Sequence, residues 1–175
     1  GTFRGVVVEE ESVVFMESVD VSANPAGVRV LGGSYLSVDE GSTIFNNGSI
    51  DDIPKGGGVW CFGANSQVDI AGQIEANKAA SGGNIYAEDG CFVQLEGGAE
   101  IKGNRQFLTY SANEGGGIYI DDGGEIFSNG GANRVLITDH WAEFGAGLYV
   151  TGTGKATLLN TFIGRNRAFN RGRGL

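Results

Sequence analysis

Two pairs of carboxylates in the central part of the chain have residue types and spacing suited to catalysis or calcium binding. Glu88-Asp89 and Asp121-Asp122 follow similar apolar segments in consecutive repeats, so we expect them in the same turn of neighbouring units. Facing carboxylates can cleave a glycosidic bond or hold Ca²⁺. The simpler alternative is that these residues are solvated and were selected for turn conformation. We expect the simpler role, with no metal and no cofactor required.

The single histidine is a second chemical candidate. His140 follows Asp139 at the end of an apolar segment, an order that faintly resembles the Ile-Asp-His phrase of pectate lyases. A lyase needs a base that takes a proton beside carboxylates that hold Ca²⁺. His140 also stands where other repeats have asparagine, which accounts for it without catalysis. We therefore predict a non-enzymatic chain and keep a polysaccharide-cleaving enzyme as the alternative.

A third set of residues suits binding. Five short segments place one large side chain between two small or apolar residues, as in Ile118-Tyr119-Ile120. Side chains alternate between the faces of a strand, so the flanking residues should face inward and the middle residue outward. The row is either simple stacking between repeats or an exposed platform for a protein or a sugar. This aromatic row is our candidate binding site: Arg29, Trp60, Tyr86, Tyr119 and Tyr149.

These candidates sit on a sequence repeat. A glycine phrase begins at residues 56, 82, 115 and 145, in steps of 26, 33 and 30 residues, with a weaker copy at 25–29. Periods in this range are typical of solenoids. A second phrase, an aliphatic residue followed three positions later by a polar one, recurs between the copies, and residues 105–113 hold an insertion of six. The polar positions are Asn24, Asn47, Asn77, Asn104, His140 and Asn166.

The repeat predicts an all-β fold, a single-stranded right-handed parallel β-helix of about six coils. Each period contains three short extended segments separated by strong turn formers, and handedness follows the general preference of parallel crossovers. An asparagine at one corner of every coil can hydrogen-bond its neighbours as a ladder. We expect residues 1–20 to form an irregular first coil and residues 21–175 to form the repeats, as a fragment of a longer chain.

Composition narrows the functional classes. The net charge of −9 argues against nucleic-acid binding, and no apolar run is long enough to span a membrane. Glycine supplies 32 of the 175 residues, well above the usual share, without the period of collagen. The two cysteines, Cys61 and Cys91, are either a disulfide or two buried thiols.

The two repeated phrases resemble the GGA[ILV] and FxxN repeats of the chlamydial-type polymorphic outer-membrane proteins. The resemblance covers about residues 21–170, with Gly or Asn replacing most alanines and Ile replacing most phenylalanines. It implies an extracellular or cell-surface structural or adhesive module that contacts a protein or a glycan in a larger assembly. An ice-binding solenoid is a further alternative, although its threonines share no single register: Thr138, Thr151, Thr153, Thr157 and Thr161.

Overall fold

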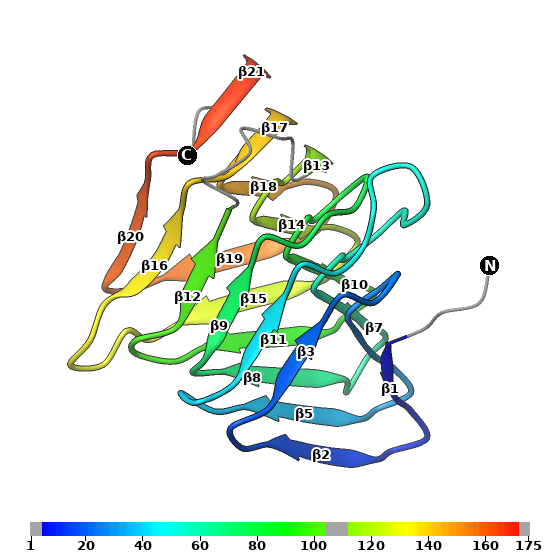
Figure 1. Cartoon of the computed structure of the whole chain (residues 1–175). Helices are drawn as coiled ribbons and strands as arrows, with labels where there is room; N and C mark the ends of the chain where they lie inside the picture. Colours follow the sequence, from blue (N-terminus) through cyan, green and yellow to red (C-terminus); the bar gives the residue numbers. More distant parts are fainter. Residues whose placement is uncertain (1–4, 104–111, 172–175) are drawn as a thin grey trace.

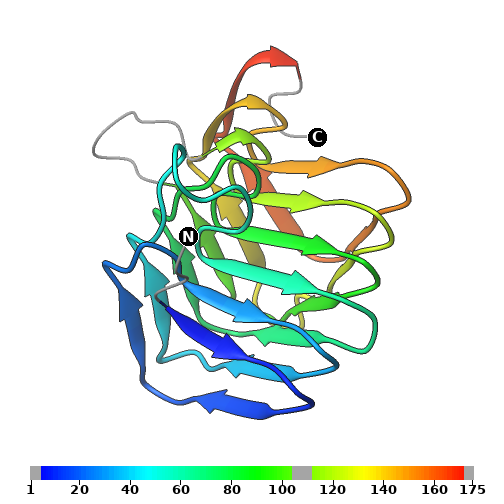
Figure 2. The same cartoon turned by 90° about the vertical axis from the view of Figure 1, so that its right-hand side faces the viewer.

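The chain folds into a parallel β-helix of six coils (Figures 1 and 2). The computed structural model describes residues 5–103 and 112–171, so Asn104 and most of the predicted insertion lie outside the described residues. The described residues contain 21 strands and no helix, and hence no helix able to cross a membrane. Every pairing between strands is parallel, which confirms the predicted fold and the number of coils.

Three six-stranded sheets form the walls of the solenoid, and each coil contributes one strand to each. Sheet A contains β1 (Val6–Val8), β4 (Val28–Val30), β7 (Val59–Phe62), β10 (Ile85–Glu88), β14 (Ile118–Ile120) and β18 (Leu148–Val150). Sheet B contains β2 (Val13–Met16), β5 (Tyr35–Val38), β8 (Gln67–Ile70), β11 (Phe92–Leu95), β15 (Glu125–Ser128) and β19 (Lys155–Leu158). Sheet C contains β3 (Asp20–Ser22), β6 (Thr43–Phe45), β9 (Gln73–Glu75), β12 (Glu100–Lys102), β16 (Val135–Thr138) and β20 (Thr161–Gly164).

A smaller fourth sheet was not predicted. Sheet D contains β13 (Ala112–Glu114), β17 (Trp141–Phe144) and β21 (Arg167–Arg171), and it lies beside the last coils (Figure 1). β17 and β21 directly follow the polar corners at His140 and Asn166, and β13 and β17 directly precede the glycine phrases that begin at residues 115 and 145. Sheet D therefore lies in the connection between sheets C and A in the second half of the molecule.

The prediction of an irregular first coil was wrong. β1, β2 and β3 pair in register with the three strands of the second coil, and the boundary expected after residue 20 falls inside β3. The acidic run at residues 9–11 suggested irregularity, but it only fills the turn between β1 and β2, where Glu10 and Glu11 have φ near 59°. The regular repeat therefore begins at Val6.

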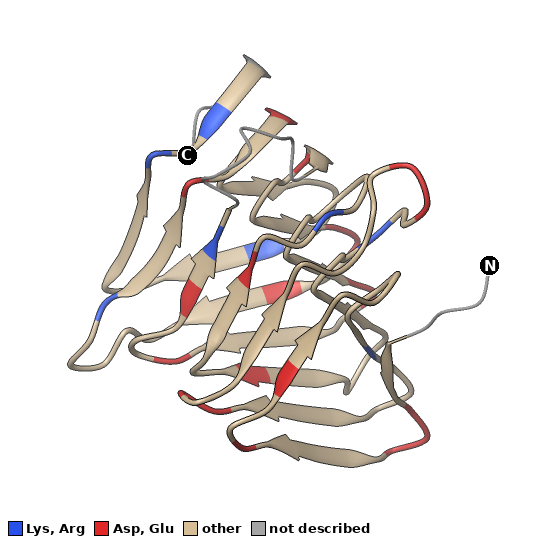
Figure 3. Cartoon of the chain, in the orientation of Figure 1, with Lys and Arg blue, Asp and Glu red and all other residues tan. Residues whose placement is uncertain are grey.

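The core is a set of aliphatic columns that run along the solenoid. In sheet C, for example, Ile44, Ile74, Ile101 and Ile137 are partners in successive coils and all are fully buried. Period-two alternation sends every second strand residue inward, and stacking places equivalent residues in contact. Lysine, arginine, aspartate and glutamate occur in the turns and on some strands (Figure 3), and none belongs to the core cluster.

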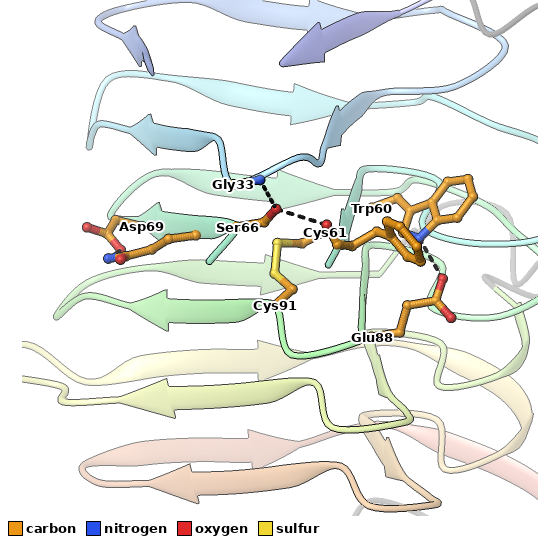
Figure 4. Close-up of a disulfide and its surroundings, with 9 residues drawn as sticks. Gly33, Trp60, Cys61, Ser66, Asp69, Glu88 and Cys91 are labelled. Carbon is orange, nitrogen blue, oxygen red and sulfur yellow. Dashed lines mark hydrogen bonds between the residues drawn. A yellow bond between two sulfur atoms is a disulfide. The ribbon is translucent and has the colours of Figure 1, made fainter. Parts of the chain in front are cut away.

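A disulfide joins two neighbouring coils inside the core (Figure 4). It connects Cys61 in β7 with Cys91 in the turn before β11, with Cα atoms 5.8 Å apart and both side chains fully buried. Of the two alternatives left open by the sequence, the structure has the disulfide. Cys61 directly follows Trp60 in β7, and the Trp60 side chain points to the opposite face of the strand from the disulfide.

Candidate functional site: the aromatic row and the surfaces around it

The predicted row exists, with its members as direct neighbours in sheet A: Arg29, Trp60, Tyr86, Tyr119 and Tyr149. The rings of Tyr86 and Tyr119 are stacked, with centroids 4.9 Å apart and planes 7° from parallel. Those of Tyr119 and Tyr149 lie 5.2 Å apart at 32°. The Arg29 guanidinium lies 4.4 Å from the centre of the Trp60 ring, a cation–π contact. The predicted register of the five residues is therefore confirmed, and their role as a binding site stays a prediction.

The expected exposure of the row is wrong at its centre. Tyr86 and Tyr119 are only 3% and 7% exposed, although both point away from the core columns. The cover comes from the segments before each glycine phrase: Lys55 pairs with Ser81 and Ser81 with Glu114 as parallel bridges, continued by sheet D. The row is thus enclosed between sheet A and a second layer of chain. Stacking between repeats therefore explains most of the row, and an exposed platform does not.

The cover is held by a charged cluster at Glu88 (Figure 4). Glu88 accepts hydrogen bonds from Lys55 Nζ at 2.5 Å and from Trp60 Nε1 at 3.0 Å, and its side chain is 8% exposed. Lys55 Nζ also lies 4.9 Å from the centre of the Tyr86 ring. Burial, and then the nearby Glu88 carboxylate, raise the pKa of Tyr86, so this tyrosine stays neutral. Glu88 therefore has a structural role, because its carboxylate is already bonded to Lys55 and Trp60.

The other acidic candidates act as turn residues. Asp89 and Asp122 have positive φ angles of 53° and 35°, and the Asp89 amide donates to the Asp122 carbonyl at 2.9 Å. The Asp121 carboxylate accepts from the Asp122 amide, also at 2.9 Å. Among the described residues, no three His, Cys, Asp or Glu side chains are grouped so that they could hold a metal. Short polar side chains that tolerate the left-handed region explain these positions.

The polar column forms the predicted ladder. Asn47 Oδ1 accepts from the amide and Nδ2 of Asn24, and Asn77 Oδ1 accepts in the same way from Asn47. Each Nδ2 also donates to the backbone carbonyl of an aliphatic residue in the neighbouring coil. Asn47 donates to Val21 at 2.8 Å, and Asn77 donates to Ile44 at 2.8 Å. Within the described residues, the ladder satisfies polar groups at the corners of successive coils, which buried backbone requires.

Sequence reasoning missed one member of this ladder. Asn84 stands in a glycine phrase, yet its Oδ1 accepts from the amide and Nδ2 of Asn77, and its own Nδ2 donates to the Lys102 carbonyl. In the other phrases the equivalent residue is glycine: a Cβ on Gly58 would lie 2.7 Å from Asn77 Nδ2. An asparagine in place of the third glycine was the signal that could have identified it.

His140 occupies an asparagine position and is inaccessible to any substrate. The side chain is fully buried, its Nε2 lies 3.0 Å from the Ile101 carbonyl, and its amide donates to Asn166 Oδ1 at 2.9 Å. A Cβ on Gly117 would lie 2.8 Å from the imidazole, so this glycine makes room for the ring. Asp139 pairs with Arg165 at 3.0 Å. This geometry supports the scaffold role over the lyase-like role.

We predict that His140→Asn flattens the acid dependence of stability. Burial lowers the pKa of His140 from 6.5 to about 4, so between these values the unfolded chain binds a proton that the folded chain excludes. The free energy of unfolding should fall as pH falls through this window, by about 3 kcal/mol in the wild type. Denaturant titrations from pH 7 to pH 4 should show that loss, and His140→Asn should lack it. An equal dependence of the free energy of unfolding on pH in the two proteins would contradict a buried neutral histidine.

The outer face of sheet B is the exposed aromatic surface that the sequence analysis did not select. Phe15 is 66% exposed, and Tyr35, Phe92 and Phe127 are partly exposed on the same face. These residues alternate with polar ones along the second strand of each coil, as in Phe92-Val93-Gln94-Leu95. That period-two pattern was visible in the sequence, but the aromatic residues shift between two adjacent columns and form no single row.

Hydrogen bonds order the polar side chains between these rings. Tyr35 donates from its hydroxyl to Asp69 Oδ2 at 2.7 Å, and Gln67 Nε2 donates to Asp69 Oδ1 at 2.8 Å. Farther along the face, Gln94 donates to Glu96. Burial, and then the bonded Asp69 carboxylate, raise the pKa of Tyr35, so its hydroxyl remains a donor. Side chains already fixed in the free protein lose little entropy on binding.

Comparison of the chain with protein-family models, curated proteins and solved structures finds no match in any of the three.

Proposed function

We propose that the chain is a non-enzymatic structural or adhesive module of a larger surface protein or assembly. In this proposal it binds a protein partner through the outer face of sheet B. The observation that carries the proposal is a set of exposed and partly exposed rings in two adjacent columns of one sheet, where neighbouring polar side chains are already bonded to one another. Aromatic residues on a rigid, pre-ordered surface are typical of protein interfaces.

Two further observations support an extracellular or cell-surface location. The Cys61–Cys91 disulfide is a feature of chains that mature in an oxidising compartment. The repeated glycine and asparagine phrases resemble those of the polymorphic outer-membrane proteins, and we extend the proposal to a passenger-like role of that kind. The accessible rims of the aromatic row, Trp60 and Tyr149, lie on sheet A and are a secondary contact in this proposal.

The test compares Phe92→Ala/Phe127→Ala with a matched control, Phe45→Ala. All three phenylalanines are partly exposed, but Phe45 lies on the outer face of sheet C. Hydrogen exchange of the native assembly should show β8, β11 and β15 protected relative to the free chain. The double variant should lose partner affinity at least tenfold, about 1.4 kcal/mol, while the control retains it.

Two results would contradict the proposal. Protection of sheet C or of the sheet D side instead of sheet B would place the contact elsewhere. Binding to a glycan with no protein partner, again lost in the double variant, would replace the protein contact with sugar stacking on the same rings.

A further inference from the structure

The sequence contains two Asn-Gly dipeptides, Asn47-Gly48 and Asn129-Gly130. An asparagine side chain loses ammonia when the backbone nitrogen of the next residue attacks its amide carbon, Cγ. Glycine in the second position favours this reaction, because it has no side chain to shield the nitrogen and leaves the backbone free to bend toward Cγ. The two dipeptides are therefore equivalent in the unfolded chain, and only the fold makes them react differently.

The asparagine ladder protects the first dipeptide. Asn47 is 1% exposed. Its Oδ1 accepts from Asn24, and its Nδ2 donates to the Val21 carbonyl and to Asn77 Oδ1. The attacking atom is also engaged, because the Gly48 amide donates to the Asn24 carbonyl at 3.0 Å. Ring closure at Asn47 would break all of these bonds, so it requires that the coil opens first.

The second dipeptide lacks this protection. Asn129 is exposed and directly follows β15, in the turn that leads to β16. Its side chain makes one hydrogen bond within the described residues, in which Oδ1 accepts from the Gly131 amide at 3.0 Å. The leaving group, Nδ2, has no partner in the described part of the chain, and neither has the Gly130 amide that would attack Cγ. Both reacting groups are therefore available in the native protein.

The turn also favours the reaction through its two glycines. Attack on Cγ places negative charge on Asn129 Oδ1, and the Gly131 amide already donates to this oxygen, as a donor in an oxyanion hole does. Gly130 has a positive φ of 53°, and a Cβ at this position would lie 2.5 Å from Asn160 Cβ in the next coil. Packing of the coils therefore requires glycine at the position where glycine makes the preceding asparagine reactive.

We propose that Asn129 is a site of spontaneous deamidation in the folded protein, whereas Asn47 is protected. The Gly130 nitrogen bonds to Asn129 Cγ and gives its proton to water, while the bond from Cγ to Nδ2 breaks and Nδ2 takes up a proton to leave as ammonia. The product is a cyclic succinimide, which water opens at either carbonyl. Opening at Cγ gives aspartate, and opening at the backbone carbonyl gives isoaspartate. Each complete reaction consumes one water and releases one ammonia.

The modification would change the rim of the sheet B face. Phe127 and Asn129 lie on the same side of the chain, with the buried Ser128 between them, so the new carboxylate appears beside the aromatic surface. Isoaspartate also adds one atom to the main chain in a turn that packs against Asn160. Aged molecules should therefore carry an additional negative charge at this rim. The inference goes beyond the proposed function and does not depend on it.

The experiment follows the full native chain during incubation at mildly alkaline pH, where hydroxide assists removal of the amide proton. Mass spectrometry of proteolytic peptides locates each residue that exchanges an NH₂ group for OH, and methyl transfer by an isoaspartyl methyltransferase detects isoaspartate. Asn129 should react at least tenfold faster than Asn47, because Asn47 reacts only when its coil opens. In denaturant the two rates should converge, since the ladder is then absent.

Asn129→Gln keeps the amide but lengthens the side chain, so it should abolish ammonia release at this turn. Asn133→Gln is the matched control: Asn133 is exposed in the same turn, but the Arg134 side chain shields the following amide, and this variant should react like the wild type. Equal native rates at Asn47 and Asn129, or a folded Asn129 that reacts only in denaturant, would overturn the proposal. Aspartate formed without isoaspartate would exclude ring closure by Gly130 and would overturn it as well.

Discussion

Replacing Asn77 with alanine is expected to lower the free energy of unfolding by about 4 kcal/mol, because about 1 kcal/mol is lost for each side-chain hydrogen bond. Asn77 is 1% exposed, and its side chain makes four such bonds: two accepted from Asn47, one donated to Ile44 and one donated to Asn84. The substitution leaves buried donors and an acceptor without partners. Denaturant unfolding followed by far-UV circular dichroism measures the loss.

Asn24→Ala is the matched control for this prediction. Asn24 occupies the same corner in the first coil, but its side chain is partly exposed and donates only two hydrogen bonds within the described structure. Its loss should cost about 1 kcal/mol or less. Equal effects of the two substitutions would show that depth in the ladder does not matter, contrary to the argument from burial.

The sequence predicted the architecture well because the repeat carries it. A glycine phrase and an aliphatic-x-x-Asn phrase recur at steps set by one turn of a solenoid, and stacking makes each recurrence a contact. The role of the third glycine emerged only from the structure: Gly58, Gly117 and Gly147 leave room for the ladder residues Asn77, His140 and Asn166. The third glycine of the phrase and the polar column are thus required together, because the ladder side chains fill the space that a Cβ would occupy.

Burial of the aromatic row could not be predicted from the same pattern. Alternation within a strand tells which side of sheet A carries Tyr86, but it does not tell what lies on that side. The covering residues, Lys55 and Glu114, precede their glycine phrases in segments that share no motif. Their position depends on long-range pairing, which local periodicity does not encode. In the sequence, the covering segments were visible only as a longer interval between the polar corner and the glycine phrase.

The sheet B face was missed for a different reason. Phe92 and Phe127 both face outward, yet they occupy adjacent columns, with Phe92 beside Glu125 and Phe127 beside Gln94. A search for one residue type at one repeat position therefore finds no row. A two-dimensional surface becomes visible only when the strands are set side by side in register.

The disulfide is expected to contribute about 3–4 kcal/mol to stability, since it closes a loop of 30 residues in the unfolded chain. Cys61→Ala/Cys91→Ala should therefore lower the free energy of unfolding by this amount and the melting temperature by about 10 °C for a chain of this size. The side chains are fully buried between two coils, so alanine leaves a small apolar gap and no unpaired polar group. Calorimetry of the wild type and the double variant measures the difference.

The control is the wild type itself, unfolded with and without a reducing agent, because reduction removes the bond and keeps both sulfur atoms. Reduced wild type and the double variant should have similar stability, both well below the oxidised protein. Two titratable thiols in the native protein, or equal stability of oxidised and reduced chains, would contradict the bridge. The first of these results would also remove the main physical argument for an oxidising compartment, because the disulfide carries more of that argument than any repeat phrase does.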